Sequence, residues 1–198
     1  MGRGYDWGSS RPYAALWFAL SDGETPATIK GEEIVFPKES LFVIAEYYGW
    51  NGRPNEGRTE ASKTQAEKIL SFQKTLPFAD RVAKGPADRN IWAYNRDSRT
   101  SIANDHKEVG LDWTRGNQVS GSRIAGANLF RKMLLAATIG PPPEDAGIYF
   151  FNTCGQAIRT IPFLPADPSK DGDVDTTSED HLWDVVRMRL LADKVLKK

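Results

Sequence analysis

Carboxylates stand at three positions of this sequence that suit the binding of a divalent cation. Asp6 precedes Gly8 at the end of a short apolar stretch, and Asp88 ends the rigid turn Gly85-Pro86-Ala87-Asp88. Asp184 lies among apolar residues near the C-terminus. Hard ions such as Mg²⁺ and Mn²⁺ prefer oxygen ligands, so carboxylates that converge from strand ends and a neighbouring helix would bind them. The alternative for Asp6 and Asp88 is a structural role in a turn or at a helix N-terminus.

The third position lies in the segment that opens the last expected helix. His181 and Asp184 are three residues apart, and Asp180 and Asp184 are four apart, so the three side chains share one helical face. Capping explains acidic residues in a first turn, but it does not require a histidine and an aspartate beside Trp183. Asp180, His181 and Asp184 therefore each remain candidates for the third metal ligand.

The elements that would position these residues begin as a run of strands and then alternate between strand and helix. Apolar, β-branched and aromatic runs predict strands at residues 4–8, 12–20, 34–36, 41–48, 81–83 and 147–151. Apolar residues at helical spacing predict helices at residues 60–76, 101–109, 119–137, 156–161 and 178–196. An antiparallel meander followed by βαβ units is typical of an α/β fold, with a mixed sheet flanked by helices.

Length and composition bound the class of protein. The 198 residues, 40% of them hydrophobic, suffice for one α/β domain with a single core. Lys+Arg and Asp+Glu both number 26, so only local patches can hold nucleic acid. Cys154 is the single cysteine, which excludes an internal disulfide and favours a small packing residue. Because no stretch approaches the roughly 18 apolar residues of a membrane span, we expect a soluble, cytoplasmic protein with no membrane partner.

Basic residues that could contact a DNA backbone gather in the second half of the chain. They are Arg89, Arg96, Arg99, Lys107, Arg115, Arg123, Arg131 and Lys132. With a neutral net charge, binding is expected to be weak, sensitive to salt and poorly sequence-specific. The six tryptophans are more simply packing residues than a platform for bases, which is the alternative.

The segment 166–177 is acidic and polar. Its D-x-D pattern does not fit a calcium-binding EF-hand, because the sixth and twelfth positions counted from Asp171 are Thr176 and Leu182 rather than Gly and Glu. We interpret it as a mobile loop near the cleft that repels DNA until it reorganises.

The order of these motifs resembles that of the large terminase subunits of tailed bacteriophages. Asp-Trp-Gly comes first, Gly-Pro-Ala-Asp in the middle, and Glu-Asp-His-x-x-Asp-x-x-Arg on the last helix. Further similar segments are Glu46-Tyr-Tyr-Gly49, Asp88-Arg-Asn-Ile-Trp92, Arg123-Ile-Ala-Gly126 and Phe150-Phe-Asn-Thr-Cys154. The likeness extends over nearly the whole chain, and the order and spacing are more specific than any single motif.

The resemblance implies a ribonuclease-H-like nuclease domain that cleaves double-stranded DNA with Mg²⁺ or Mn²⁺, two ions in all. By motif match, the metal-binding positions are Asp6, Asp88 and Asp184, with His181 beside the third and Asp180 as an alternative ligand. In such a site the ions lie about 3.5–4 Å apart, one orienting the attacking hydroxide and the other stabilising the leaving oxygen.

The resemblance also implies partners. The family's packaging ATPase needs a phosphate loop, and GxxxxGK[ST] does not occur here, so we expect residues 1–198 to be one nuclease domain without the ATPase domain. The expected partners are double-stranded DNA, that ATPase domain, the portal and the small terminase subunit, in the cytoplasm of an infected host cell.

Two other functions fit the same residues. A resolvase or transposase-type nuclease would use the same carboxylates on a different DNA, and a catalytically silent module of the packaging motor would use the acidic helix for docking. A serine or cysteine hydrolase is disfavoured, because no G-x-S-x-G is present and only His106 and His181 could act as a base.

Overall fold

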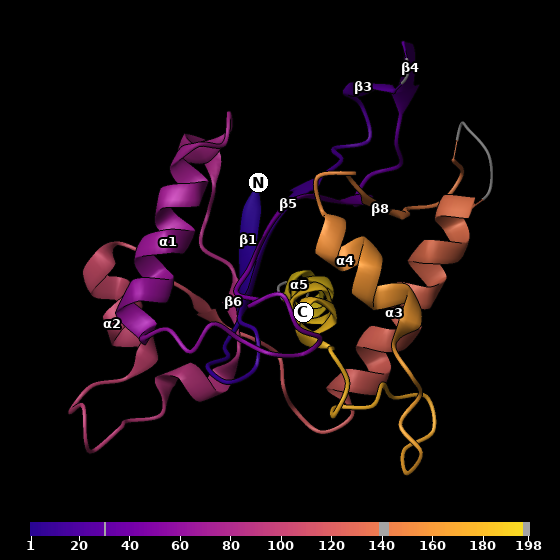
Figure 1. Cartoon of the computed structure of the whole chain (residues 1–198). Helices are drawn as coiled ribbons and strands as arrows, with labels where there is room; N and C mark the ends of the chain where they lie inside the picture. The colour runs from indigo at the N-terminus through magenta and orange to yellow at the C-terminus, as the bar shows by residue number, and fades with distance from the viewer. Residues whose placement is uncertain (30, 139–142, 196–198) are drawn as a thin grey trace.

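A mixed sheet of six strands lies at the centre of the computed structural model, which describes residues 1–29, 31–138 and 143–195 (Figure 1). The strands lie in the order β7-β6-β1-β2-β5-β8. The β1–β2 and β2–β5 pairs are antiparallel, whereas β1–β6, β6–β7 and β5–β8 are parallel. The strands are β1 (Gly2–Asp6), β2 (Ala14–Leu20), β5 (Leu41–Tyr48), β6 (Pro86–Ala87), β7 (Thr114–Arg115) and β8 (Ile148–Phe150). The expected mixed α/β sheet is confirmed.

β2 lies in the middle of the sheet because both of its faces are apolar. Ala14, Leu16 and Phe18 belong to one buried cluster, and Ala15 and Trp17 belong to the other. All five are fully buried. A strand covered on both faces has a continuous apolar sequence rather than an alternating one, which is what this segment shows.

Helices cover both faces of the sheet (Figure 1). One face carries α3 (Ser122–Thr138), α4 (Gly155–Thr160) and α5 (His181–Val195), and the other carries α1 (Ser62–Lys74) and α2 (Ile102–Val109). Among the described residues, no helix is long and apolar enough to cross a membrane.

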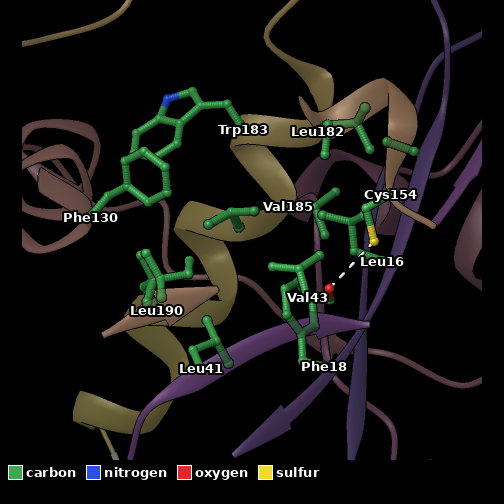
Figure 2. Packing of buried hydrophobic residues seen from close by; sticks show 14 of the residues in the cluster. Leu16, Phe18, Leu41, Val43, Phe130, Cys154, Leu182, Trp183, Val185 and Leu190 are labelled. Atoms are coloured by element: carbon green, nitrogen blue, oxygen red, sulfur yellow. Dashed lines mark hydrogen bonds between the residues drawn. The ribbon is translucent and has the colours of Figure 1, made fainter. Parts of the chain in front are cut away.

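The core under α5 packs side chains from three helices against the sheet (Figure 2). Phe130 of α3 meets Trp183 of α5 edge-on, with 4.9 Å between the ring centroids. Cys154 is a buried, free cysteine, as expected, and its thiol lies 3.4 Å from the carbonyl oxygen of Val43. This packing fixes the position of α5 over the sheet.

Polar bonds on the opposite face fix the end of β1. Tyr5 Oη donates to Gln65 Oε1 of α1 (2.6 Å), and Gln65 Nε2 donates to the carbonyl oxygen of Gly8 (2.8 Å). A side chain has no room at Gly8, because a Cβ there would lie 2.4 Å from the carbonyl oxygen of Arg11. The turn that follows Asp6 is therefore held in one place.

The structure differs from the predictions in its short elements. β3 (Pro26–Ile29) and β4 (Glu32–Val35) form a separate hairpin, at the top of Figure 1. The sequence predicted a strand near 34–36 but not its partner, because this exposed hairpin lacks an apolar stripe.

The strand predicted at 81–83 is wrong. Ala79–Arg81 is a turn of 3₁₀ helix (η1), Ala83 forms only an isolated bridge with Gly2, and the strand falls at β6. The last helix begins at His181 rather than at Ser178, and residue 196 of its predicted range lies outside the described residues.

Candidate functional site

Asp6 and Asp88 lie at the carboxyl ends of two adjacent parallel strands. Tyr5 of β1 is in register with Ala87 of β6, and the backbone N–H of Asp88 donates to the carbonyl oxygen of Tyr5 (3.1 Å). Each aspartate is the residue that follows one member of this pair. Residues that end adjacent parallel strands meet at one edge of a sheet, which is where α/β proteins commonly bind ligands.

α5 brings Asp184 to the same edge. This helix lies so close to β1 that a Cβ at Gly4 would be 2.8 Å from Cγ1 of Val185. Asp6 is only 7% exposed. Burial raises the pKa of Asp6 well above its ordinary value, and the carboxylates of Asp184 and then Asp88 raise it further. The structure therefore gathers three carboxyl groups from distant positions in the sequence, close enough that a negative charge on one disfavours a negative charge on the others.

The carboxylate of Asp88 is held by its own turn. Its Oδ1 accepts from the backbone N–H of Asn90 (2.9 Å) and from Nε2 of Gln118 (3.1 Å). Gln118 also accepts from the backbone N–H of Arg89 (2.9 Å). Asp88 thus does cap the short 3₁₀ helix η2 (Arg89–Trp92), the alternative foreseen from the sequence, while it also lies beside Asp6.

His181 contacts Asp6 directly. Its Nδ1 lies 3.2 Å from Asp6 Oδ2, and its Nε2 lies 3.0 Å from Oδ1 of Asn55. Asn55 Nδ2 donates to the carbonyl oxygen of Thr177 (3.1 Å), so its oxygen faces the histidine and accepts from Nε2–H. Burial lowers the pKa of His181, which favours the neutral ring. A neutral ring with its proton on Nε2 presents a lone pair to Asp6, so a proton or a cation is needed between the two.

Arg123 of α3 is the centre of an ion-pair cluster. Its guanidinium lies 2.9 Å from Asp173, 3.1 Å from Asp180 and 2.8 Å from Asp184. Asp173 belongs to the acidic segment 166–177, which is therefore tied to the protein at this point. We expected Arg123 on the DNA surface, but the structure commits its guanidinium to the protein's own carboxylates.

Two arginines hold the same oxygen of Asp184. Arg187 Nε, one turn further along α5, donates to Asp184 Oδ1 at 3.0 Å, and Arg123 donates to this atom from α3. Arg187 is 2% exposed, and the backbone of Gly126 packs against it without room for a side chain. Arg187 ends the Glu-Asp-His-x-x-Asp-x-x-Arg motif, but the sequence analysis gave it no role at the site, and it did not single out Asn55. The position of Arg187, three residues after Asp184 on an apolar helix, was the signal that could have assigned it.

The other predicted DNA contacts fall into two groups. Arg89 comes shortly after β6 and Arg115 lies in β7, both on the Asp88 side of the sheet. The guanidinium of Arg115 lies over the ring of Trp92, 5.3 Å from its centroid. Arg131 and Lys132 lie further along α3 and are exposed; Arg131 reaches the carbonyl oxygen of Gly172 (3.4 Å).

His106 lies outside this cluster. It is fully buried and accepts a hydrogen bond from Trp113 (3.0 Å), so it is unavailable as a base.

The donor set fits a hard divalent cation in its chemistry. Asp6, Asp88 and Asp184 supply carboxylate oxygens, and His181 presents a nitrogen lone pair beside them. As the side chains stand, no three His, Cys, Asp or Glu side chains of the described residues are gathered tightly enough to ligate one ion. His181 and the two arginines instead occupy oxygens of Asp6 and Asp184.

A six-stranded mixed sheet with these helices on its faces is the fold seen in solved nuclease domains of large terminases. The chain is similar to the large terminase of the thermophilic bacteriophage D6E, with a TM-score of 0.62 and 14% identity over 98% of this chain and 39% of that one. The large-terminase nuclease domain of bacteriophage SPP1, solved with bound Mn, has a TM-score of 0.53 and 14% identity, covering 96% of this chain and 85% of that domain. The P22 large-terminase nuclease domain has a TM-score of 0.55 and 12% identity, covering 99% of this chain and 85% of that domain.

These similarities confirm the fold that the motif order implied. At such low identity they concern the fold alone. No protein-family profile matches the sequence, and no curated protein matches it. The chain spans 39% of the length of the D6E large terminase.

Proposed function

We propose that this chain is the nuclease domain of a genome-packaging terminase and that it cleaves double-stranded DNA with Mg²⁺ or Mn²⁺. The observation that carries the proposal is the convergence of Asp6, Asp88 and Asp184 at one sheet edge, in a fold similar to terminase nuclease domains. A resolvase-type nuclease would use the same carboxylates, but the solved structures that resemble this chain favour the packaging role.

The three carboxylates are the proposed ligands, and the ions, two in all, would supply an activated water and charge stabilisation at the phosphate. Asp6 and Asp88 come from strand ends that a shared backbone bond keeps in place. Arg123 and Arg187 fix one oxygen of Asp184 and so set the direction of the other. His181 is proposed to accept or release a proton at Nδ1, because Asn55 holds the proton of its other nitrogen.

The domain organisation and partners are also proposals. Residues 1–198 form one nuclease domain that would work beside an ATPase domain, the portal and a small terminase subunit in the host cytoplasm. Arg89, Arg115, Arg131 and Lys132 are the proposed contacts to the DNA backbone.

Cleavage of a supercoiled plasmid tests the function. We expect nicking or linearisation with Mn²⁺ or Mg²⁺ and none with EDTA. Loss of a residue that only supports a metal ligand typically reduces activity by about 10- to 100-fold. Asp6→Asn and Asp88→Asn remove proposed ligands, so each should slow cleavage by more than this. Asp80→Asn, an exposed carboxylate of η1, is the matched control and should cut as the parent does.

Thermal denaturation verifies that the variants fold. Asp6→Asn removes a charge that burial and its neighbours disfavour, so it should not lower stability. If the folded parent neither cleaves DNA nor binds Mn²⁺ in calorimetry, the nuclease function is wrong and a docking module becomes the better account.

A further inference from the structure

Trp7 is the exception among the tryptophans. Trp17, Trp113 and Trp183 are buried, as expected of packing residues, whereas Trp7 is 37% exposed. It directly follows Asp6. The turn that carries it is fixed by the bond from Gln65 to Gly8, so the backbone that bears the exposed ring is held in one place.

A second exposed ring lines the same groove. Tyr94 is 66% exposed, and Trp7 and Tyr94 both line a groove of about 560 Å³. Neither ring packs against another aromatic ring within the described part of the chain. The volume falls in the range of about 300–1,000 Å³ that encloses a small ligand.

The groove is lined by residues from the turns that follow Asp6 and Asp88. Trp7 follows Asp6, and Asn90, another lining residue, donates its backbone N–H to Asp88. A ligand lying in the groove would therefore contact the turns that carry the two strand-end carboxylates.

The carboxylates that line this groove have partners of their own. Glu60 is paired with Lys68 and accepts from Tyr13 Oη (2.6 Å), and Asp105 accepts from the hydroxyl of Ser62. The charge of Glu60 is thus balanced by Lys68, and both carboxylates have hydrogen-bond donors within the protein.

A second groove continues from the aromatic one. Ser98 and Asp105 line both, and the second groove, of about 720 Å³, adds Arg99, Lys107 and Glu108, whose carboxylate pairs with Lys63. Arg99 and Lys107 are exposed and form no ion pair among the residues that the structure describes. Along the two grooves, the surface thus offers two exposed aromatic rings first and two cations without an ion-pair partner second.

We propose that Trp7 and Tyr94 stack on an unpaired nucleobase next to the scissile phosphate, and that Arg99 and Lys107 bind phosphates of the same strand. Bases inside a duplex have their faces covered by their neighbours, so only a base that has left the stack can lie between these rings. Aromatic faces that stack on bases, combined with cationic side chains that follow the backbone, are the usual means of binding a single strand. The inference rests on the proposed nuclease function and adds that the substrate strands are separated over a few nucleotides at the cut.

Fluorescence of 2-aminopurine tests the stacking. The probe is a DNA duplex with three central unpaired nucleotides, one of them 2-aminopurine, in EDTA so that no metal-dependent cleavage occurs. The parent protein should quench the probe. Trp7→Ala and Tyr94→Ala should each abolish part of the quenching and weaken binding by about 5- to 150-fold, the equivalent of 1–3 kcal/mol per stacked base.

Several variants serve as controls. Trp7→Phe and Tyr94→Phe keep an aromatic face and should retain most of the affinity. Phe163→Ala removes an aromatic ring that is 82% exposed and outside both grooves, and should bind as the parent does. The parent and Trp7→Ala should bind a fully paired duplex with affinities that differ by less than about twofold, because no base of that duplex is available for stacking.

Salt dependence tests the phosphate contacts. Replacing Arg99 and Lys107 together by glutamine should reduce the slope of log affinity against log salt concentration by about 1.4, since each phosphate contact on a single strand contributes about 0.7.

The outcomes separate the two proposals. If the parent cuts plasmid but Trp7→Ala and Tyr94→Ala bind and quench the unpaired probe as the parent does, the stacking subsite is wrong and the nuclease function stands. If the parent binds neither probe and cuts no DNA, both proposals are wrong.

Discussion

Replacing Arg123 by methionine should lower the free energy of unfolding by about 3–5 kcal/mol, the usual cost of removing one partner from a buried ion pair. Methionine keeps most of the stem volume but removes the guanidinium that contacts Asp173, Asp180 and Asp184 together. Asp173 and Asp180 are 3% and 5% exposed, so water cannot replace the lost hydrogen bonds. The three carboxylates would also repel one another.

Urea denaturation measures this effect. Arg131→Met, on the same helix but exposed, is the control and should change the free energy of unfolding by less than about 1 kcal/mol. Mn²⁺ should raise the urea concentration at the unfolding midpoint more for Arg123→Met than for the parent, because a cation can replace the missing positive charge. A variant as stable as the parent would show that Arg123 does not compensate these carboxylates.

Asp184→Asn should abolish metal-dependent cleavage, whereas Asp180→Asn should reduce it by less than about tenfold, below the usual loss for a metal-site partner. Asp184 is the carboxylate that most strongly raises the pKa of Asp6 after burial itself. Burial, together with Asp184, raises the pKa of Asp180 to about 7, so the neutral form is already well populated at neutral pH. Asparagine resembles that form and keeps an oxygen for Arg123.

The same plasmid assay measures both variants, with Mn²⁺ calorimetry as a second readout. Equal losses of cleavage and of Mn²⁺ affinity in the two variants would contradict this assignment and make Asp180 a ligand. If Asp184→Asn cleaved DNA as fast as the parent, Asp184 of α5 would not be a metal ligand.

The sequence predicted those parts of the fold and site that local patterns determine. The apolar run of β2 and the helical spacing of α1 and α3 indicated their elements, because burial on one or both faces leaves a periodic trace. Asp6 and Asp88 were recognisable because glycine and proline mark the turns that follow or precede them.

The rest depends on contacts between distant segments. β7 has two residues and gains its place by pairing with β6, so no periodicity marks it. Arg123 was expected at DNA because its partners lie 50 or more residues away in the sequence. Asn55 belongs to the loop after β5, and only the fold brings it to His181.

The most direct test of the central claim is manganese anomalous diffraction from crystals grown with Mn²⁺. We predict that the strongest peak contacts the carboxylates of Asp6, Asp88 and Asp184, at the carboxyl ends of β1 and β6. A manganese peak elsewhere in the protein, with none at this cluster, would contradict the account.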